Sequence, residues 1–207
     1  MNFFGHATVA YLQSDDPRFV LGAMLPDLCS MAGLRVQTVL DEELGRGVAL
    51  HHETDRRFHG SRGFLALCTS ALETLEPRGV SRASARAVGH VGSELLLDGF
   101  LSHDQQARAA YGRALDGALQ QKLGSAVVWK NGAQAASLHA MLARLQRAPV
   151  PEGYRDPAFV YARLEGILSR RPRLALRPCD TEPVQAWLYG AAEQLALDGD
   201  AILAAVS

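Results

Sequence analysis

The chain has 207 residues, of which 48% are hydrophobic and 21% charged, and this composition is typical of an ordinary globular protein. Its 21 basic and 22 acidic residues nearly cancel, so no strong field of one sign attracts nucleic acid or an anionic membrane, and we expect neither as a partner. Three widely spaced cysteines form neither a disulfide framework nor a metal knuckle, and no signal peptide or membrane span is recognisable, which favours a cytoplasmic protein.

Helix-forming residues dominate and β-branched alternation is nearly absent, so helices are expected along the whole chain. The expected helices cover residues 3–13, 19–33 (broken at Gly22 and Pro26), 38–59, 62–76 after a Ser61 cap, 81–104, 104–123, 133–146, 157–171 and 182–205. Residues 148–159 hold three prolines and a glycine and form the clearest loop. The sequence therefore predicts an all-α fold, a single compact multi-helix domain over residues 1–207.

The segment "HHETDRRFH" within the helix expected at 38–59 carries an unusual set of ionisable residues. His51, Asp55 and His59 lie at i, i+4 and i+8, on one helix face. Imidazole nitrogen and carboxylate oxygen together suit a divalent ion such as manganese, iron, zinc or cobalt. A polar helix face that happens to be rich in histidine is the alternative.

A second stripe lies in "HVGSELLLDGF", where His90, Glu94 and Asp98 follow the same spacing. This helix is so apolar that most of its circumference should be buried. A buried carboxylate destabilises the folded protein by several kcal/mol unless it is paired with a cation or binds a metal ion. The stripe therefore indicates either a metal site or a buried salt bridge to an arginine.

Two single residues add to these stripes. His6 lies among apolar residues in "FFGHATVAY", and Asp27 follows a proline in "GAMLPDLCS". Taken alone, His6 is readily explained as a core residue and Asp27 as a helix cap. Helical proteins build metal sites by converging such residues on the interior of a bundle, so the stripes and these two residues together predict one.

The order of motifs resembles the acyl carrier protein phosphodiesterase family, which is similar in turn to the all-helical HD-type metal-dependent phosphohydrolases. The matching segments run from residue 1 to about 176 and comprise "MNFFGH", "LGAMLPDL", "GVALHHETD", "ELLLDGFLS" and "GILSRRPRLAL". The resemblance implies an HD-like helical bundle and a divalent metal, with manganese expected and iron, zinc or magnesium as alternatives. The implied reaction is hydrolysis of the phosphodiester that joins phosphopantetheine to a serine of acyl carrier protein.

The resemblance also assigns residues. Its metal ligands fall on His6, Asp27, His51, Asp55 and Asp98, while Glu94 stands where the family tends to have aspartate. His59 extends the stripe of His51 and Asp55 and is a further candidate ligand, although the family has an acidic residue there. Gly99 replaces the family's usual histidine, His52 replaces a basic residue, and residues 104–155 match poorly.

A mechanism can be written from these assignments. We expect a carboxylate, Asp55 or Glu94, to orient the attacking water, and arginines to bind the phosphate or an acidic carrier protein. The candidate arginines are Arg56, Arg170, Arg171 and Arg173, although the last three also fit a solvated helix C-terminus. The alternatives are a phosphohydrolase of the same fold that acts on a nucleotide or another small phosphodiester, and a non-catalytic helical binding module.

Overall fold

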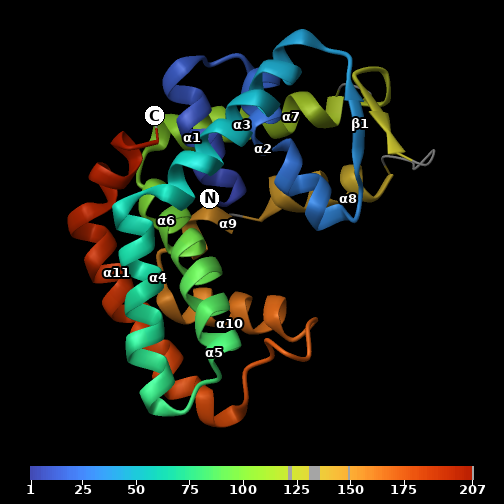
Figure 1. Cartoon of the computed structure of the whole chain (residues 1–207). Helices are drawn as coiled ribbons and strands as arrows, with labels where there is room; N and C mark the ends of the chain where they lie inside the picture. Colours follow the sequence, from blue (N-terminus) through green and yellow to red (C-terminus); the bar gives the residue numbers. More distant parts are fainter. Residues whose placement is uncertain (121–122, 131–135, 149, 207) are drawn as a thin grey trace. The chain divides into compact units, whose positions relative to one another are not determined.

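The computed structural model describes residues 1–120, 123–130, 136–148 and 150–206, and these are mostly helical (Figure 1). Their backbone contacts divide them into two compact units, each built from two separate stretches of chain. The first unit comprises residues 1–56 and 104–150, and the second comprises residues 57–103 and 151–206. Each unit therefore needs parts of the chain that are distant in sequence.

The first unit packs helices against one another beside a short β-ribbon. Its elements are α1 (Phe3–Gln13), α2 (Pro17–Ala32), β1 (Val36–Val39), most of α3 (Glu42–Gly60), α7 (Gln105–Gln120), the 3₁₀ turn η3 (Leu123–Ser125), β2 (Val127–Trp129) and α8 (Ala136–Arg147). Helices α1, α2 and α7 pack pairwise, and α8 covers α7. Apolar side chains such as Phe4, Met24 and Leu115 fill the space between these helices and are fully buried.

The described residues of the second unit form helices and connecting turns, with no β-strand among them. Its elements are α4 (Arg62–Leu75), the 3₁₀ turn η1 (Glu76–Arg78), α5 (Arg82–Ala87), the π-helical segment η2 (Val88–Gly92), α6 (Ser93–Leu101), α9 (Val150–Gly153, beginning at the boundary), α10 (Pro157–Leu168), the 3₁₀ turn η5 (Pro178–Asp180) and α11 (Thr181–Ala204). Helix α11 packs along α4 and α6, and α10 packs on α11 (Figure 1).

Several helix boundaries follow from local capping. The Ser61 hydroxyl accepts a hydrogen bond from the main-chain N–H of Phe64 (3.3 Å) at the start of α4. Asp156 caps α10 by accepting from Ala158 (2.9 Å). Gly79 ends the turn after α4 with a φ of 89°, a conformation that glycine adopts without a side-chain clash. The predicted Ser61 cap is confirmed.

The prediction of helix from residue 38 is wrong at its start. Residues 36–39 form β1, which pairs antiparallel with β2 through Val36 opposite Trp129 and Val39 opposite Val127. The fold is therefore mostly rather than purely helical. The ribbon forms because two β-branched segments about 90 residues apart in the sequence pair with each other. A local sequence pattern does not predict such a non-local pairing.

Helix α2 is continuous, although a break was expected at Gly22 and Pro26. Proline has no N–H to donate to the carbonyl of Gly22, and this loss usually kinks or ends a helix. Here the flanking turns are held by Leu25 and Leu28, which are both fully buried. Tertiary packing therefore overrides the local signal. The loop expected at 148–159 likewise contains the short helix α9.

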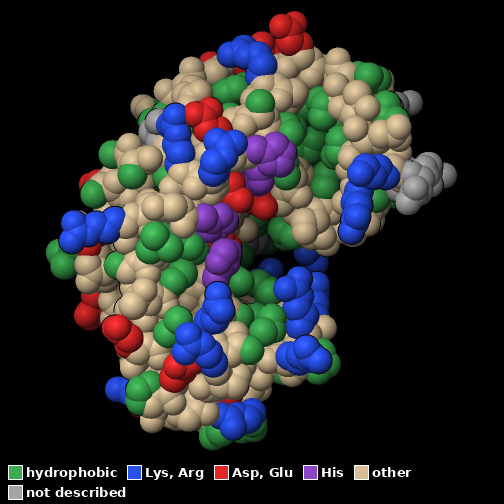
Figure 2. Space-filling view, viewed as in Figure 1, with side chains coloured by type: hydrophobic (Ala, Val, Ile, Leu, Met, Phe, Trp, Pro, Cys, Tyr) green, Lys and Arg blue, Asp and Glu red, His purple; other side chains and the backbone are tan. Residues whose placement is uncertain are grey.

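No helix among the described residues is both long and apolar enough to cross a lipid bilayer. Figure 2 shows basic, acidic and hydrophobic side chains intermingled on the viewed face. This mixture agrees with the formal net charge of −1.

Candidate metal centre

Three helices of the first unit bring histidine and aspartate side chains together. His6 comes from α1, Asp27 from α2, and His51 and Asp55 from α3, and we call these four residues the His6 cluster. One ligand atom each of His6, Asp27 and His51 lies within 4.8 Å of the other two. Both imidazoles are buried, whereas the carboxylates reach solvent in part. The sequence predicted all four as site residues.

A close crossing of α2 and α3 fixes the position of His51. A Cβ atom added at Gly22 would overlap the main-chain carbonyl of Leu44, and one added at Gly47 would overlap that of Phe19. The two backbones are therefore closer than any side chain would permit. One turn beyond Gly47, this approach brings the imidazole of His51 against α2.

The hydrogen bond of His51 sets its tautomer. Its Nδ1 lies 2.9 Å from the main-chain carbonyl of Ala23, and because a carbonyl only accepts, Nδ1 must carry the hydrogen. The lone pair is therefore on Nε2. Burial, with a smaller contribution from nearby His6, lowers the pKa of His51 to about 3, so the ring is neutral near pH 7. A neutral imidazole with a free ring lone pair is the form that binds a metal ion.

A hydrogen bond also sets the tautomer of His6. Its Nδ1 lies 2.9 Å from the hydroxyl of Thr54, and that hydroxyl directs its own hydrogen toward the main-chain carbonyls of Leu50 and His51, both at 3.0 Å. The hydroxyl has a single hydrogen, so it accepts the hydrogen of His6 Nδ1, and the lone pair of His6 is on Nε2. The two imidazoles lie face to face, with ring centroids 3.9 Å apart.

Two carboxylates face the lone-pair nitrogen of His6. Nε2 lies 4.0 Å from an oxygen of Asp27 and 3.7 Å from an oxygen of Asp55, which also accepts from the Met1 amine at 2.8 Å. The 3.7 and 4.0 Å separations are too long for hydrogen bonds. They match two ligands of one ion, which lie about 3–4.4 Å apart when each bond is about 2.0–2.2 Å. This spacing and donor set fit the manganese, iron, zinc or cobalt expected from the sequence.

The first unit also contains a cavity whose described lining mixes polar and apolar side chains and includes none of the four residues of the His6 cluster. Its volume is about 570 Å³, and its lining includes Pro26 and His52, the sequence neighbours of Asp27 and His51. Arg35 and Lys130 line it at the end of the ribbon, where the N–H of Lys130 donates to the carbonyl of Arg35 (2.9 Å). We call this cavity the Arg35 pocket. Its volume is in the range of small-ligand sites.

The second unit holds another group of ligand-type side chains, His59, His90 and Glu94, which we call the His59 cluster. Nε2 of His59 lies 3.0 Å and Nε2 of His90 3.3 Å from the same oxygen of Glu94. Burial alone would raise the pKa of the Glu94 carboxyl, but the hydrogen bonds from His59 and His90 outweigh it and hold that pKa well below its usual range. Glu94 is therefore a carboxylate at neutral pH.

Asp98, one turn after Glu94, is fully buried in α6. With burial as the larger cause, its charge raises the pKa of the neighbouring Tyr154 hydroxyl. Gly99 stands where the resembled family has histidine, and a Cβ there would overlap the carbonyl of Tyr154. Arg155 holds this segment on α6 by donating to the hydroxyl of Ser102 (2.8 Å). Close backbone packing therefore explains the glycine.

The predicted arginines are all exposed. Arg56 lies on α3, and Arg170, Arg171 and Arg173 follow the end of α10. Their roles in binding phosphate or a carrier protein stay predictions. The role of Asp98 as a metal ligand also stays a prediction, as does the binding of one ion by both His59 and His6. The sequence does not predict Thr54, Arg35 and Lys130, because no spacing links Thr54 to His6, which it contacts, or links Arg35 and Lys130 to the pocket that they line.

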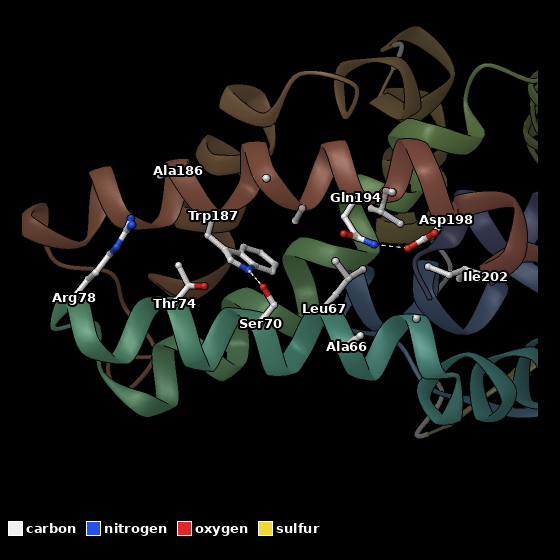
Figure 3. Close-up of a pocket in the computed structure, with 14 residues that line it drawn as sticks. Ala66, Leu67, Ser70, Thr74, Arg78, Ala186, Trp187, Gln194, Asp198 and Ile202 are labelled. Carbon is white, nitrogen blue, oxygen red and sulfur yellow. Dashed lines mark hydrogen bonds between the residues drawn. The ribbon is translucent and has the colours of Figure 1, made fainter.

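The second unit also contains a more apolar cavity, of about 480 Å³, between α4 and α11 (Figure 3). Trp187 spans it and donates from its indole nitrogen to the hydroxyl of Ser70 (3.3 Å), and Gln194 donates to Asp198. Its described lining contains no histidine or cysteine. This cavity therefore offers no set of residues suited to metal chemistry.

Comparison of the chain with protein-family models, with curated proteins and with solved structures found no match.

Proposed function

We propose that the protein is a metal-dependent phosphodiester hydrolase whose metal ion is held by His6, Asp27 and His51, with Asp55 beside them. One observation supports this most strongly. Each of the two buried histidines has its Nδ1 engaged by a fixed acceptor, which places the ring lone pair of each on Nε2, the atom that would bind a cation. When bound, a divalent ion supplies charge stabilisation at a phosphoryl oxygen and lowers the pKa of water. Manganese is the metal proposed, with iron, zinc or magnesium as alternatives.

The Arg35 pocket supports an anionic substrate. Arg35 and Lys130 place two cationic side chains in the same pocket as Pro26 and His52, the sequence neighbours of Asp27 and His51, and His52 adds a hydrogen-bond donor. A phosphodiester carries one negative charge, which a guanidinium recognises through two parallel hydrogen bonds and an ammonium as a point charge. We propose that these side chains hold the phosphate.

Asp55 is the proposed residue for orienting the attacking water. Its side chain is 36% exposed, so water reaches it, while its contacts with the first unit fix its direction. Water oxygen forms a bond to phosphorus, the bond from phosphorus to the leaving alkoxide breaks, and the alkoxide takes up a proton. With holo-acyl carrier protein as substrate, the products are a free serine hydroxyl and 4′-phosphopantetheine.

The carrier protein as substrate rests on the family resemblance. Acyl carrier proteins are acidic, and the exposed Arg170, Arg171 and Arg173 are the proposed docking residues. Reversing the charge of Arg170 and Arg171 should weaken binding of holo-acyl carrier protein and reduce its salt dependence. Unchanged affinity would rule out this docking surface.

The experiment uses the full chain, stripped with a chelator and reloaded with Mn²⁺. Holo-acyl carrier protein and bis(p-nitrophenyl) phosphate are offered separately, and release of phosphopantetheine is followed by mass spectrometry. We expect Mn²⁺-dependent turnover that Asp27→Asn abolishes and that Asp15→Asn, a change at an exposed aspartate of the same unit, leaves intact. Absence of Mn²⁺-dependent hydrolysis of both substrates would contradict the proposal.

The Arg35 pocket also favours a second candidate, hydrolysis of a small phosphodiester or nucleotide, because its volume suits a small ligand without a carrier protein. Turnover of the small substrate alone would favour this candidate. If Mn²⁺ bound without any hydrolysis, or did not bind at all, a non-catalytic helical module would be favoured instead.

A further inference from the structure

The His59 cluster has a geometry that the proposed hydrolase does not use. Two imidazole nitrogens, from residues 31 positions apart in the sequence, converge on one oxygen of one carboxylate, at 3.0 and 3.3 Å. The two rings are stacked, with centroids 4.8 Å apart and an interplanar angle of 26°. The three ligand atoms lie within 4.8 Å of one another, a spacing that the ligands of one ion can adopt.

The backbone and an aromatic side chain hold this arrangement in place. His90 lies within the π-helical segment Val88–Gly92, and π-helical turns inside helices are frequent at functional sites. The ring of Phe64 packs against both imidazoles, with centroids 5.0 Å from His59 and 5.2 Å from His90. These contacts restrict the rotamers of the two histidines before any ligand arrives.

We propose that His59, His90 and Glu94 form a second metal site, which binds a transition-metal ion independently of the His6 cluster. Two histidines and one carboxylate are the donor set of many zinc and non-haem iron(II) sites. The side chains are 31%, 49% and 16% exposed, so an ion can enter from solvent and can keep positions open for water or a small anion. Figure 2 shows histidine side chains that reach the surface.

The competing explanation is a purely hydrogen-bonded cluster, in which both histidines donate to Glu94 and no ion binds. The two explanations differ in what happens when His90 is changed. As a ligand, His90 is needed for one full equivalent of metal. As a half-exposed hydrogen-bond donor, it contributes a little stability and no metal.

The test is titration of the chelator-stripped full chain with Co²⁺, followed by its visible absorption bands and by calorimetry. We expect His90→Gln and Glu94→Gln each to lose one equivalent of bound Co²⁺. Asp27→Asn should keep that equivalent, because it affects the His6 cluster alone. His103→Gln, a change at an exposed histidine of the same unit outside the cluster, is the matched control and should bind as the unchanged chain does.

Because His90 is half-exposed, His90→Gln should fold normally, which far-ultraviolet circular dichroism checks. Equal Co²⁺ stoichiometry in His90→Gln and His103→Gln would overturn the second site. That result would leave the proposed hydrolase untouched, since its metal is assigned to other residues.

Discussion

His51 donates its Nδ1 hydrogen to the main-chain carbonyl of Ala23 at 2.9 Å, and this bond joins α3 to α2 next to their glycine crossing. The bond fixes the imidazole in the neutral tautomer with Nε2 as its free ligand atom. A structural contact between two helices is thus also the contact that prepares a metal ligand.

The first prediction concerns the glycine crossing. Gly47→Ala should destabilise the protein by about 1–3 kcal/mol, the usual cost of overpacking, because the added methyl group meets the carbonyl of Phe19. Gly45→Ala, two residues earlier in the same helix, has its nearest neighbour at 3.9 Å and should be neutral or stabilising by up to about 1 kcal/mol. Urea denaturation midpoints measure both. Equal midpoints for the two variants would mean that the helices do not cross at Gly47.

The second prediction concerns stabilisation by metal. An ion that binds only the folded chain adds about 2.7 kcal/mol when its free concentration is 100 times Kd, which for a chain of this size raises Tm by about 5–10 °C. We expect Mn²⁺ to raise the Tm of the stripped chain in this way. His51→Gln should lose most of the gain, whereas His139→Gln, at an exposed histidine of α8, should keep it. Differential scanning calorimetry distinguishes these outcomes, and a full gain in His51→Gln would exclude His51 as a ligand.

The third prediction concerns the Arg35 pocket. Removing both cationic side chains with Arg35→Ala and Lys130→Ala should raise KM for bis(p-nitrophenyl) phosphate by about 10–100-fold, since a hydrogen bond to a charged group contributes about 1.5–3 kcal/mol. The metal content of this variant should not change. Arg144→Ala, at an exposed arginine of α8, serves as the control. Steady-state kinetics that show the same KM in both variants would place the phosphate elsewhere.

The fourth prediction concerns the acid stability of the second unit. Hydrogen bonds from the Arg177 guanidinium and main-chain N–H lower the pKa of the buried Asp180 below its ordinary value. Because the folded pKa is the lower one, the carboxylate stabilises the protein fully above its unfolded pKa of about 3.9, and this stabilisation is lost as the pH falls further. Asp180→Asn should therefore lower the free energy of unfolding at pH 7 and flatten its dependence on pH below about 4. A pH profile parallel to that of the unchanged chain would contradict this role.

Sequence patterns predicted the helices best where a cap or a helix breaker marks a boundary. Ser61 and Asp156 start their helices through a side-chain bond to the main chain a few residues on, which depends on nearby sequence alone. Pro26 misled the prediction because α2 continues through it under the constraint of buried neighbours. The ribbon of β1 and β2 was missed because its pairing depends on segments far apart in the chain.

Some features of the candidate site could likewise be predicted from the sequence, and others could not. Regular helical spacing pairs His51 with Asp55, and His90 with Glu94, and the structure brings the members of both pairs into common clusters. The partners that set the tautomers lie outside any such pattern. Ala23 contributes through its main-chain carbonyl, whose role does not depend on its side chain, and Thr54 is one of many polar residues that a helix presents.

The most direct test of the metal centre is crystallography of the full chain in Mn²⁺, with data collected near the manganese absorption edge. The prediction is an anomalous peak in the first unit about 2.0–2.3 Å from Nε2 of His6 and of His51 and from a carboxylate oxygen of Asp27. Fully ordered His6, Asp27 and His51 side chains with no anomalous peak among them, at Mn²⁺ concentrations that saturate other sites in the crystal, would contradict the proposed centre.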